Sequence, residues 1–285
     1  MHQAIRRSIG MGRVVVHLAR GAATMALVFP FIGDARRRRI IKRWSDGVLD
    51  IFGLTLEVVG EPFANDLGRP VLIVGNHISW VDVYAYLSVG EFKFVAKSEV
   101  RSWPLIGWFA RTLGTIFVER DRPRDALRVG NELREALDAG HAVCLFPEGT
   151  TTNGSVVLPF SSVLISAATA TDTPVQPVSI AYRGPNDEIC TRAAFTGDAT
   201  LVGSIWALVG SGRSVVRLTF LEPIPTKGAD RRALARQAED AVRASLGHAP
   251  RVVSEMVSAS RRDAISSDRG GDVPRTAPIE TAPLV

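Results

Sequence analysis

From residue 54 onward, short apolar segments alternate with segments of helical periodicity, and this alternation limits the folds open to the chain. Apolar runs of this length are typical of buried strands. We predict strands at 54–59, 71–75, 92–96, 115–118, 142–146, 175–181 and 215–221. The helical segments between or after them are 80–89, 101–113, 123–139, 160–171 and 230–246. Strands separated by helices predict an α/β fold with a largely parallel central sheet flanked by helices.

The composition fits one catalytic domain with an extension at each end. Of the 285 residues, 46% are hydrophobic and 22% are charged, as in folded globular proteins. No internal repeat and no Gly/Ser-rich linker divides the chain. We predict a basic and apolar membrane-association segment at 1–50 and a catalytic domain at 51–250. The segment 251–285 is rich in Ser, Arg, Asp, Pro and Thr, which predicts a disordered tail.

The first 46 residues carry most of the positive charge. Ten Lys and Arg residues face two Asp residues there, a net charge of +8, within a total of +5 for the whole chain. Such an excess can indicate binding to nucleic acid or to an anionic lipid surface. Residues 21–33 are uncharged and apolar, and no interleaved aromatic residues accompany the Arg36–Arg39 run. We therefore expect the membrane surface as a partner and no nucleic acid.

The apolar run 21–33 is short for a transmembrane helix. Its thirteen residues reach about 20 Å as a helix, against roughly 30 Å of bilayer hydrocarbon. Extending it back to Val14 brings in His17 and Arg20, and Pro30 interrupts its far end. Because positive residues flank both sides, both ends should stay on the cytoplasmic face of the membrane. We predict a peripheral or monotopic protein with this segment lying in one leaflet; a single short spanning anchor or a core helix are the alternatives.

The segment Asn76–Asp82 (NHISWVD) directly follows the predicted strand 71–75. In α/β folds, ligands and catalytic groups gather at the carboxyl ends of strands. His77 and Asp82 can meet if the chain turns before the next helix begins, and Ser79 is a good residue for such a start. Asp82 could then orient His77 as a general base that activates a substrate hydroxyl. Taken alone, the spacing also fits a simple helix-capping loop.

The segment Gly114–Arg120 (GTIFVER) contains the predicted strand 115–118 and ends with an arginine. Arginine is suited to bidentate contact with a phosphate group. A solvated cluster of charges after a strand is the alternative, because such clusters are common on protein surfaces.

The segment Phe146–Thr150 (FPEGT) lies at the end of another predicted strand, and five fixed residues in this order arise by chance only rarely. Its Pro and Gly shape a turn, in which Glu148, Thr150 and backbone N–H groups can converge on one bound group. The segment Val175–Ile180 (VQPVSI) combines β-branched residues with a proline, and we expect it to be architectural.

Taken in order, NHISWVD, GTIFVER, FPEGT and VQPVSI resemble the four sequence blocks of the glycerolipid acyltransferase family, which includes 1-acylglycerol-3-phosphate acyltransferases. The resemblance extends over about residues 70–180. It implies an enzyme that moves a fatty acyl group from acyl-CoA or acyl carrier protein to the free hydroxyl of 1-acyl-sn-glycerol-3-phosphate, in phospholipid biosynthesis. It also implies no metal and no cofactor beyond the thioester co-substrate.

The resemblance implies a role for each of eight residues. His77 is expected to be the catalytic base and Asp82 its orienting partner. The expected substrate-binding residues are Asn76, Gly114, Arg120, Glu148, Gly149 and Thr150. The acceptor hydroxyl, deprotonated by His77, would attack the thioester carbonyl, and a backbone N–H near the NH or FPEGT turn would stabilise the oxyanion.

Two positions differ from the family pattern. Many relatives have an arginine where Thr151 stands, and a lysine or arginine where Ser161 stands. Both differences reduce the positive charge available to a phosphate. A neighbouring branch of the family acylates lyso-ornithine lipid, whose zwitterionic head has no phosphate, and FPEGTTTNG is compatible with that acceptor. We place 1-acyl-sn-glycerol-3-phosphate first and lyso-ornithine lipid second, because Arg120 alone can still make a charge-assisted bidentate contact.

Two other classes of function compete with this hypothesis. A non-catalytic membrane lipid-binding protein could share the fold, but the intact pair of His77 and Asp82 argues against it. A hydrolase would need an activated nucleophile or a metal site, and the sequence indicates neither. The apolar stretch Trp103–Phe109 fits either an acyl groove at the membrane interface or a plain packed helix.

Overall fold

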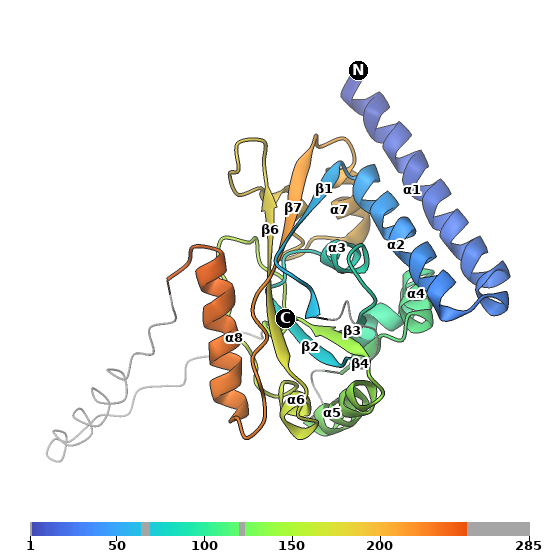
Figure 1. The fold of residues 1–285 in the computed structure, drawn as a ribbon. Helices are drawn as coiled ribbons and strands as arrows, with labels where there is room; N and C mark the ends of the chain where they lie inside the picture. Colours follow the sequence, from blue (N-terminus) through green and yellow to red (C-terminus); the bar gives the residue numbers. More distant parts are fainter. Residues whose placement is uncertain (1, 64–68, 120–122, 250–285) are drawn as a thin grey trace, which may run out of the picture. The chain divides into compact units, whose positions relative to one another are not determined.

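The computed structural model describes residues 2–63, 69–119 and 123–249. Within these residues one sheet has the strand order β1-β7-β6-β2-β5-β3-β4 (Figure 1). Neighbouring strands are parallel except for β6 and β7, which are antiparallel. The sheet is therefore largely parallel, and the predicted α/β class is confirmed. The strands are β1 (Leu54–Val59), β2 (Val71–Gly75), β3 (Lys93–Lys97), β4 (Ile116–Val118), β5 (Ala142–Leu145), β6 (Val175–Arg183) and β7 (Ser214–Phe220).

Each of these strands lies within two residues of its predicted bounds. The α-helices are α1 (His2–Leu27), α2 (Asp34–Ile51), α3 (Asp82–Leu87), α4 (Ile106–Thr112), α5 (Pro123–Asp138), α6 (Ser166–Ala170), α7 (Leu201–Leu208) and α8 (Arg231–Ser245). Short 3-10 helices are η1 (Phe29–Phe31), η3 (Ser98–Ser102) and η4 (Thr191–Ala193).

Two predicted helices begin more than two residues before the observed ones, and the structure shows a cause for each difference. The segment 101–113 divides into the end of η3 and α4, because Pro104 and a positive φ of 63° at Leu105 interrupt it. The segment 160–171 contains only the short α6. Its first residues form irregular structure and turns instead: the Phe160 N–H donates to Glu239 and the Ser161 N–H donates to the Pro147 carbonyl.

Both faces of the sheet are covered, as a parallel sheet requires. Successive residues of β2, all buried, alternate between two hydrophobic clusters: Val71 and Ile73 belong to one, Leu72 and Val74 to the other. The first cluster includes residues of α1, α2, α3 and α7, and the second includes residues of α5, α6 and α8. Figure 1 shows these helices on opposite sides of the sheet. The central position of β2 places the residues that follow it deep in the fold.

The N-terminal helices pack closely against each other (Figure 1). His17 Nε2 lies 2.8 Å from the Trp44 carbonyl oxygen, the Trp44 indole N–H donates to the His17 carbonyl at 3.1 Å, and the two rings stack with centroids 5.0 Å apart. Small residues allow this approach: a Cβ at Gly21 would lie 2.6 Å from the Trp44 ring, and one at Gly47 would lie 2.6 Å from the His17 ring. The α1–α2 pair is therefore fixed by specific packing.

Helix α1 extends well beyond the predicted apolar run and includes His17 and Arg20. By length and composition, Ala4–Phe31 is long and apolar enough to cross a membrane, and its most apolar window is only 17% buried. Helix α1 is therefore longer than the predicted apolar run, and the place of this segment in one leaflet stays a prediction. The predicted tail 251–285 lies outside the described residues, and the predicted boundary after residue 50 stays a prediction.

Candidate active site

Parallel pairing brings the predicted motifs to one edge of the sheet. Residues Val74 of β2 and Leu145 of β5 are register partners, so the chain after β2 and the chain after β5 leave the sheet side by side. His77 and the 146–150 turn therefore lie together although about seventy residues separate them. Strands β3 and β4 end at the same edge. Arg120 follows β4 by two residues and lies outside the described residues.

The side chains of His77 and Asp82 are in contact. The chain turns at residues 76–81 before α3 begins, and His77 Nδ1 lies 2.8 Å from Asp82 Oδ2. Asp82 is fully buried, and its Oδ2 also accepts from the N–H groups of Ile78 and Ser79 at 2.8 and 2.9 Å. Its other oxygen accepts from the Tyr182 hydroxyl at 2.7 Å. These donors compensate for burying a carboxylate.

The contact with Asp82 determines which imidazole nitrogen is available for chemistry. Because a carboxylate only accepts hydrogen bonds, Nδ1 of His77 carries the hydrogen and Nε2 has a free lone pair. No described residue is a hydrogen-bond partner of Nε2, and His77 lines the large cavity described below. His77 is thus a candidate base that Asp82 orients through Nδ1 and whose Nε2 is free beside the cavity.

The His77 ring and backbone are held from three directions. The Phe146 ring stacks on the imidazole with centroids 3.9 Å apart and planes within 4°. The His77 N–H donates to Glu148 Oε1 at 2.8 Å, and its carbonyl accepts from the Thr152 N–H at 2.8 Å. All three contacts come from the segment after β5, so residues 146–152 position the histidine.

Glu148 braces the site. Its Oε2 accepts from the Leu158 N–H at 2.8 Å, while its Oε1 accepts from His77. Burial raises the pKa of Glu148 to about 7, although these two backbone hydrogen bonds oppose the rise. Glu148 is not among the residues that line the cavity. The predicted contact between Glu148 and substrate stays a prediction, and what the geometry assigns to its carboxylate is the link between two loops.

The side chain of Asn76 also makes its hydrogen bonds within the protein. Its side chain is completely buried, its Nδ2 donates to the Ile180 carbonyl at 2.9 Å, and its Oδ1 accepts from the Ile180 N–H at 2.8 Å. These bonds tie the chain after β2 to β6. A substrate contact by this side chain, as predicted, would require breaking both of them.

The remaining predicted binding residues lie in turns beside the cavity. Gly149 and Thr150 line it, and Gly149 has a φ of 75°, which favours glycine. Gly114 has a φ of 72° in the turn between α4 and β4, and its neighbours Leu113 and Thr115 line the cavity. The structure therefore gathers the NH and FPEGT turns around His77. Gly114 itself is not among the residues that line the cavity, although the residues before and after it are.

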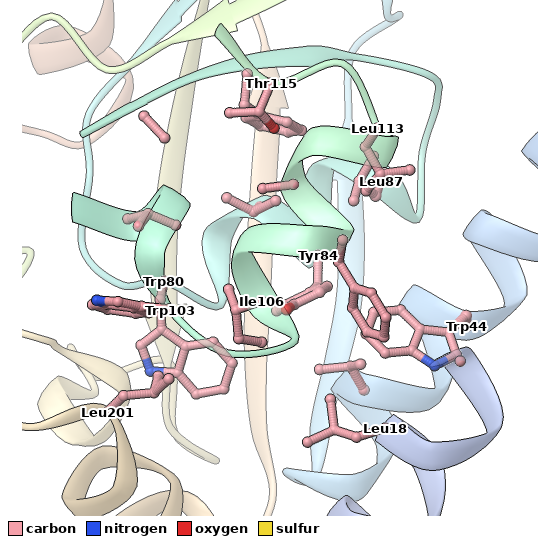
Figure 2. A pocket seen from close by; sticks show the side chains of 18 of the residues that line it. Leu18, Trp44, Trp80, Tyr84, Leu87, Trp103, Ile106, Leu113, Thr115 and Leu201 are labelled. Carbon is pink, nitrogen blue, oxygen red and sulfur yellow. The ribbon is translucent and has the colours of Figure 1, made fainter. Parts of the chain in front are cut away.

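A cavity of about 770 Å³ lies between the α1–α2 pair and the carboxyl edge of the sheet. Most of its lining is apolar, and about half of the lining residues lie on α1, α2, α3 and α4. Figure 2 shows Trp44, Tyr84 and Ile106 directed into this region. Trp103, Ile106 and Phe109 of the predicted stretch 103–109 are part of the wall. The stretch is thus packed and also lines the cavity, and its predicted role as a membrane interface or an acyl groove stays a prediction.

Sequence reasoning missed two residues of the site. Tyr182 is two residues beyond VQPVSI, in the period-2 register of the buried residues Val178 and Ile180, and this alternation was the available signal. Phe195 lines the cavity, and its backbone joins two motifs: its N–H donates to the Ile78 carbonyl at 2.9 Å, and its carbonyl accepts from the Thr151 hydroxyl. No local pattern marks Phe195, because it follows a short 3-10 helix in a long connection.

The known proteins to which this chain is similar are named as acyltransferases. The model of the family described as Acyltransferase matches residues 55–181. A lyso-ornithine lipid O-acyltransferase from Pseudomonas aeruginosa is 38% identical over 212 residues, 74% of this chain and 79% of that protein. A 1-acyl-sn-glycerol-3-phosphate acyltransferase from Neisseria meningitidis is 31% identical over 212 residues, 74% of this chain and 82% of that protein. The crystal structure of the acyltransferase PlsC from Thermotoga maritima matches 86% of this chain and 95% of that one, with a TM-score of 0.64 and 24% identity, and it shares the fold.

Proposed function

The chain belongs to the acyltransferase family, and from this premise we propose that it transfers a fatty acyl group from a thioester to the hydroxyl of a lysolipid by general base catalysis at His77. The observation that carries the mechanism is the contact of 2.8 Å between His77 Nδ1 and the buried Asp82 carboxylate, which leaves Nε2 free beside the cavity. A base in this arrangement needs no serine nucleophile, since the substrate supplies the hydroxyl.

The proposed reaction needs one proton carrier. Nε2 of His77 takes the proton from the acceptor hydroxyl as its oxygen attacks the thioester carbonyl carbon. The tetrahedral intermediate then collapses, the carbon–sulfur bond breaks, and the imidazolium returns the proton to the departing thiolate. Asp82 stabilises the imidazolium between these steps. The backbone N–H groups of Thr150 and Thr151, which both line the cavity, are suited to stabilise the oxyanion.

The shape and lining of the cavity support a long apolar substrate. Its volume of about 770 Å³ is within the usual range for ligand sites, and a fatty acyl chain requires a predominantly apolar wall. His77 lies on the same wall surface as Trp80, Tyr84 and Phe146. We propose that the cavity holds an acyl chain with its reacting carbonyl near Nε2 of His77.

For the acceptor we propose lyso-ornithine lipid, with 1-acyl-sn-glycerol-3-phosphate as the second candidate, which reverses the order expected from the sequence. At Thr151, where many family members have an arginine, the neutral hydroxyl donates to the Phe195 carbonyl and is thereby engaged. Arg20, Arg43 and Lys97 line the cavity, and Glu99 is the one carboxylate residue in the described part of its wall. A carboxylate opposes a phosphate but can pair with the ammonium of a zwitterionic head. The relative from Pseudomonas aeruginosa carries the corresponding name.

The donor and the location are parts of the same proposal. We propose acyl carrier protein or acyl-CoA as the donor, with no metal and no further cofactor. The helical stretch Ala4–Phe31, whose most apolar window is largely exposed, supports attachment to a membrane, as do Arg6 and Arg7 near its start and the Arg36–Arg39 run after it. We propose that the active site faces the cytoplasm, where such donors are made.

Acylation assays with purified protein in detergent test the proposal. Each donor would be combined with lyso-ornithine lipid or 1-acyl-sn-glycerol-3-phosphate, for the wild type and for His77→Ala and Thr151→Arg. We expect preferential acylation of lyso-ornithine lipid, a loss of about 100-fold or more in His77→Ala, and a shift toward the phosphate acceptor in Thr151→Arg. Acylation of the phosphate acceptor alone would refute the acceptor assignment. Wild-type turnover in His77→Ala would refute the mechanism.

A further inference from the structure

Outside the motif segments, a buried pair of charged residues on α8 contacts the loop that Glu148 also contacts. Glu239 is only 1% exposed, and Arg243 Nε lies 2.9 Å from Glu239 Oε1. The other buried residues on this face of α8 are apolar: Leu234, Ala235, Ala238 and Val242. A charged pair on an apolar helix face is unfavourable to bury unless each charge has further hydrogen-bond partners.

Both side chains have such partners on the backbone of residues 157–160. Glu239 Oε2 accepts from the Phe160 N–H at 3.0 Å, and the Arg243 guanidinium donates to the Val157 carbonyl. Between these two contacts, the Leu158 N–H donates to Glu148 Oε2 at 2.8 Å. The short loop is thus held by α8 at its two ends and joined to Glu148 at its middle.

Glu148 extends this connection to the histidine. Its Oε1 accepts from the His77 N–H at 2.8 Å, so one carboxylate links the 157–160 loop to the backbone that carries the imidazole. We propose that Glu239 and Arg243 are positioning residues for acyl transfer: by fixing residues 157–160 they fix Glu148, and through it the place of His77. This inference rests on the proposed role of His77 as the general base.

A role in fold stability alone leads to a different expectation. Replacing both members of a buried ion pair by apolar residues of similar size is often neutral or stabilising, so the pair as a whole is a weak source of stability. Removing one member is different, because it leaves the other charge buried and unpaired and lowers stability. The hydrogen bonds from the pair to the loop also determine where backbone atoms lie, and a shift of about 1 Å near an active site can lower the rate about 100-fold. The kcat and pH profile of the folded Arg243 variants therefore separate a positioning role from a role in stability.

The charge on Arg243 provides a second readout. Burial raises the pKa of Glu148, the hydrogen bonds from Leu158 and His77 lower it, the nearby Asp82 carboxylate raises it, and Arg243 lowers it. These are the groups that face the Glu148 carboxylate. Without the guanidinium, Glu148 should hold its proton to higher pH. A protonated carboxyl cannot accept on both oxygens as well, so the acidic limb of the pH–rate profile should move to higher pH.

The experiment compares Arg243→Met, Arg243→Lys and Glu239→Gln with Arg236→Met, a matched control on the exposed side of the same helix. His77→Ala serves as the reference for lost catalysis. For each, kcat, KM, the pH–rate profile and Tm would be measured in the acylation assay, with whichever acceptor the wild type uses. We expect Arg243→Met to lower Tm, because Glu239 loses its ion-pair partner. In the folded variant, kcat should fall about 10- to 100-fold with little change in KM, and the acidic limb should move to higher pH. Arg243→Lys should recover part of kcat, and Arg236→Met should match the wild type.

A folded Arg243→Met variant with wild-type kcat and pH profile would overturn the inference. If that variant does not fold, Glu239→Gln and Arg243→Lys decide, and wild-type kcat in both would equally refute a positioning role. If His77→Ala is inactive and Arg243→Met is fully active, the inference about α8 is refuted and the proposed mechanism still stands. Full activity in His77→Ala would instead remove the premise of both.

Discussion

Two buried tyrosines on the same face of the sheet allow a matched test of how Asp82 is held. Tyr182 and Tyr86 are 2% and 0% exposed. The Tyr182 hydroxyl donates to Asp82 Oδ1 at 2.7 Å, whereas the Tyr86 hydroxyl has no hydrogen-bond partner among the described residues. Each can be changed to phenylalanine, which removes one oxygen atom and preserves the ring. The two substitutions are chemically identical and differ in what the hydroxyl contacts.

The structure predicts that only the change at Tyr182 lowers the free energy of unfolding. Tyr182→Phe removes a hydrogen bond to a buried carboxylate, which contributes about 1.5 to 3 kcal/mol to the free energy of unfolding. Tyr86→Phe removes an unpaired buried hydroxyl, so it should be neutral or stabilising by about 1 kcal/mol. The variants should differ by at least about 1.5 kcal/mol, which corresponds to roughly 3 to 6 °C in Tm for a domain of this size.

Thermal unfolding followed by tryptophan fluorescence in detergent would measure the difference, and the pH–rate profile would show its functional effect. In Tyr182→Phe, Asp82 accepts one hydrogen bond fewer. Its negative charge should then stabilise the imidazolium form of His77 more strongly. The acidic limb of the profile should therefore move to higher pH, while Tyr86→Phe keeps the wild-type profile. Equal Tm values and equal profiles in the two variants would refute the reasoning.

Three other changes test the site and its surroundings. Asn76→Ala should lower the free energy of unfolding by about 2 kcal/mol or more, measured by urea denaturation, because the buried N–H and carbonyl of Ile180 lose their partner; an unchanged midpoint would contradict this. Gly47→Val should lower Tm and activity together, because a Cβ there would lie 2.6 Å from the His17 ring and would push α1 from α2; wild-type values would show that the helices separate freely. Between about pH 4.5 and pH 7 the folded state holds the Glu148 proton more tightly than the unfolded state, so wild-type stability should fall as pH rises through this window. Glu148→Gln should lack that dependence, and parallel curves of stability against pH would disprove the raised pKa.

Much of the fold was predictable from the chain because the strands are continuous apolar runs. Strand β2 is buried on both faces, and such a strand is recognisable from five residues alone. The helices were less predictable at their ends. Leu105 adopts a positive φ and Phe160 is held by Glu239, and neither local pattern shows these constraints.

The candidate site divides in the same way. His77 and Asp82 are five residues apart, so local chain geometry could bring them together, and the motif was sufficient to propose their contact. Tyr182 reaches Asp82 from a hundred residues away, and the choice depends on which strand lies next to β2. The role of Glu148 was equally hidden, because one carboxylate oxygen faces His77 and the other faces Leu158.

The sequence by itself determined the α/β class, the two turns at strand ends and the resemblance to lipid acyltransferases, because each depends on periodicity or on a few residues close together in the chain. Only the tertiary structure decided that α1 and α2 form a wall of the cavity, that Asn76 and Glu148 brace the loops, and that α8 reaches the site. The physical reason is that these features consist of hydrogen bonds and packing between segments distant in sequence. Such contacts depend on strand order and register, which local residue preferences do not encode.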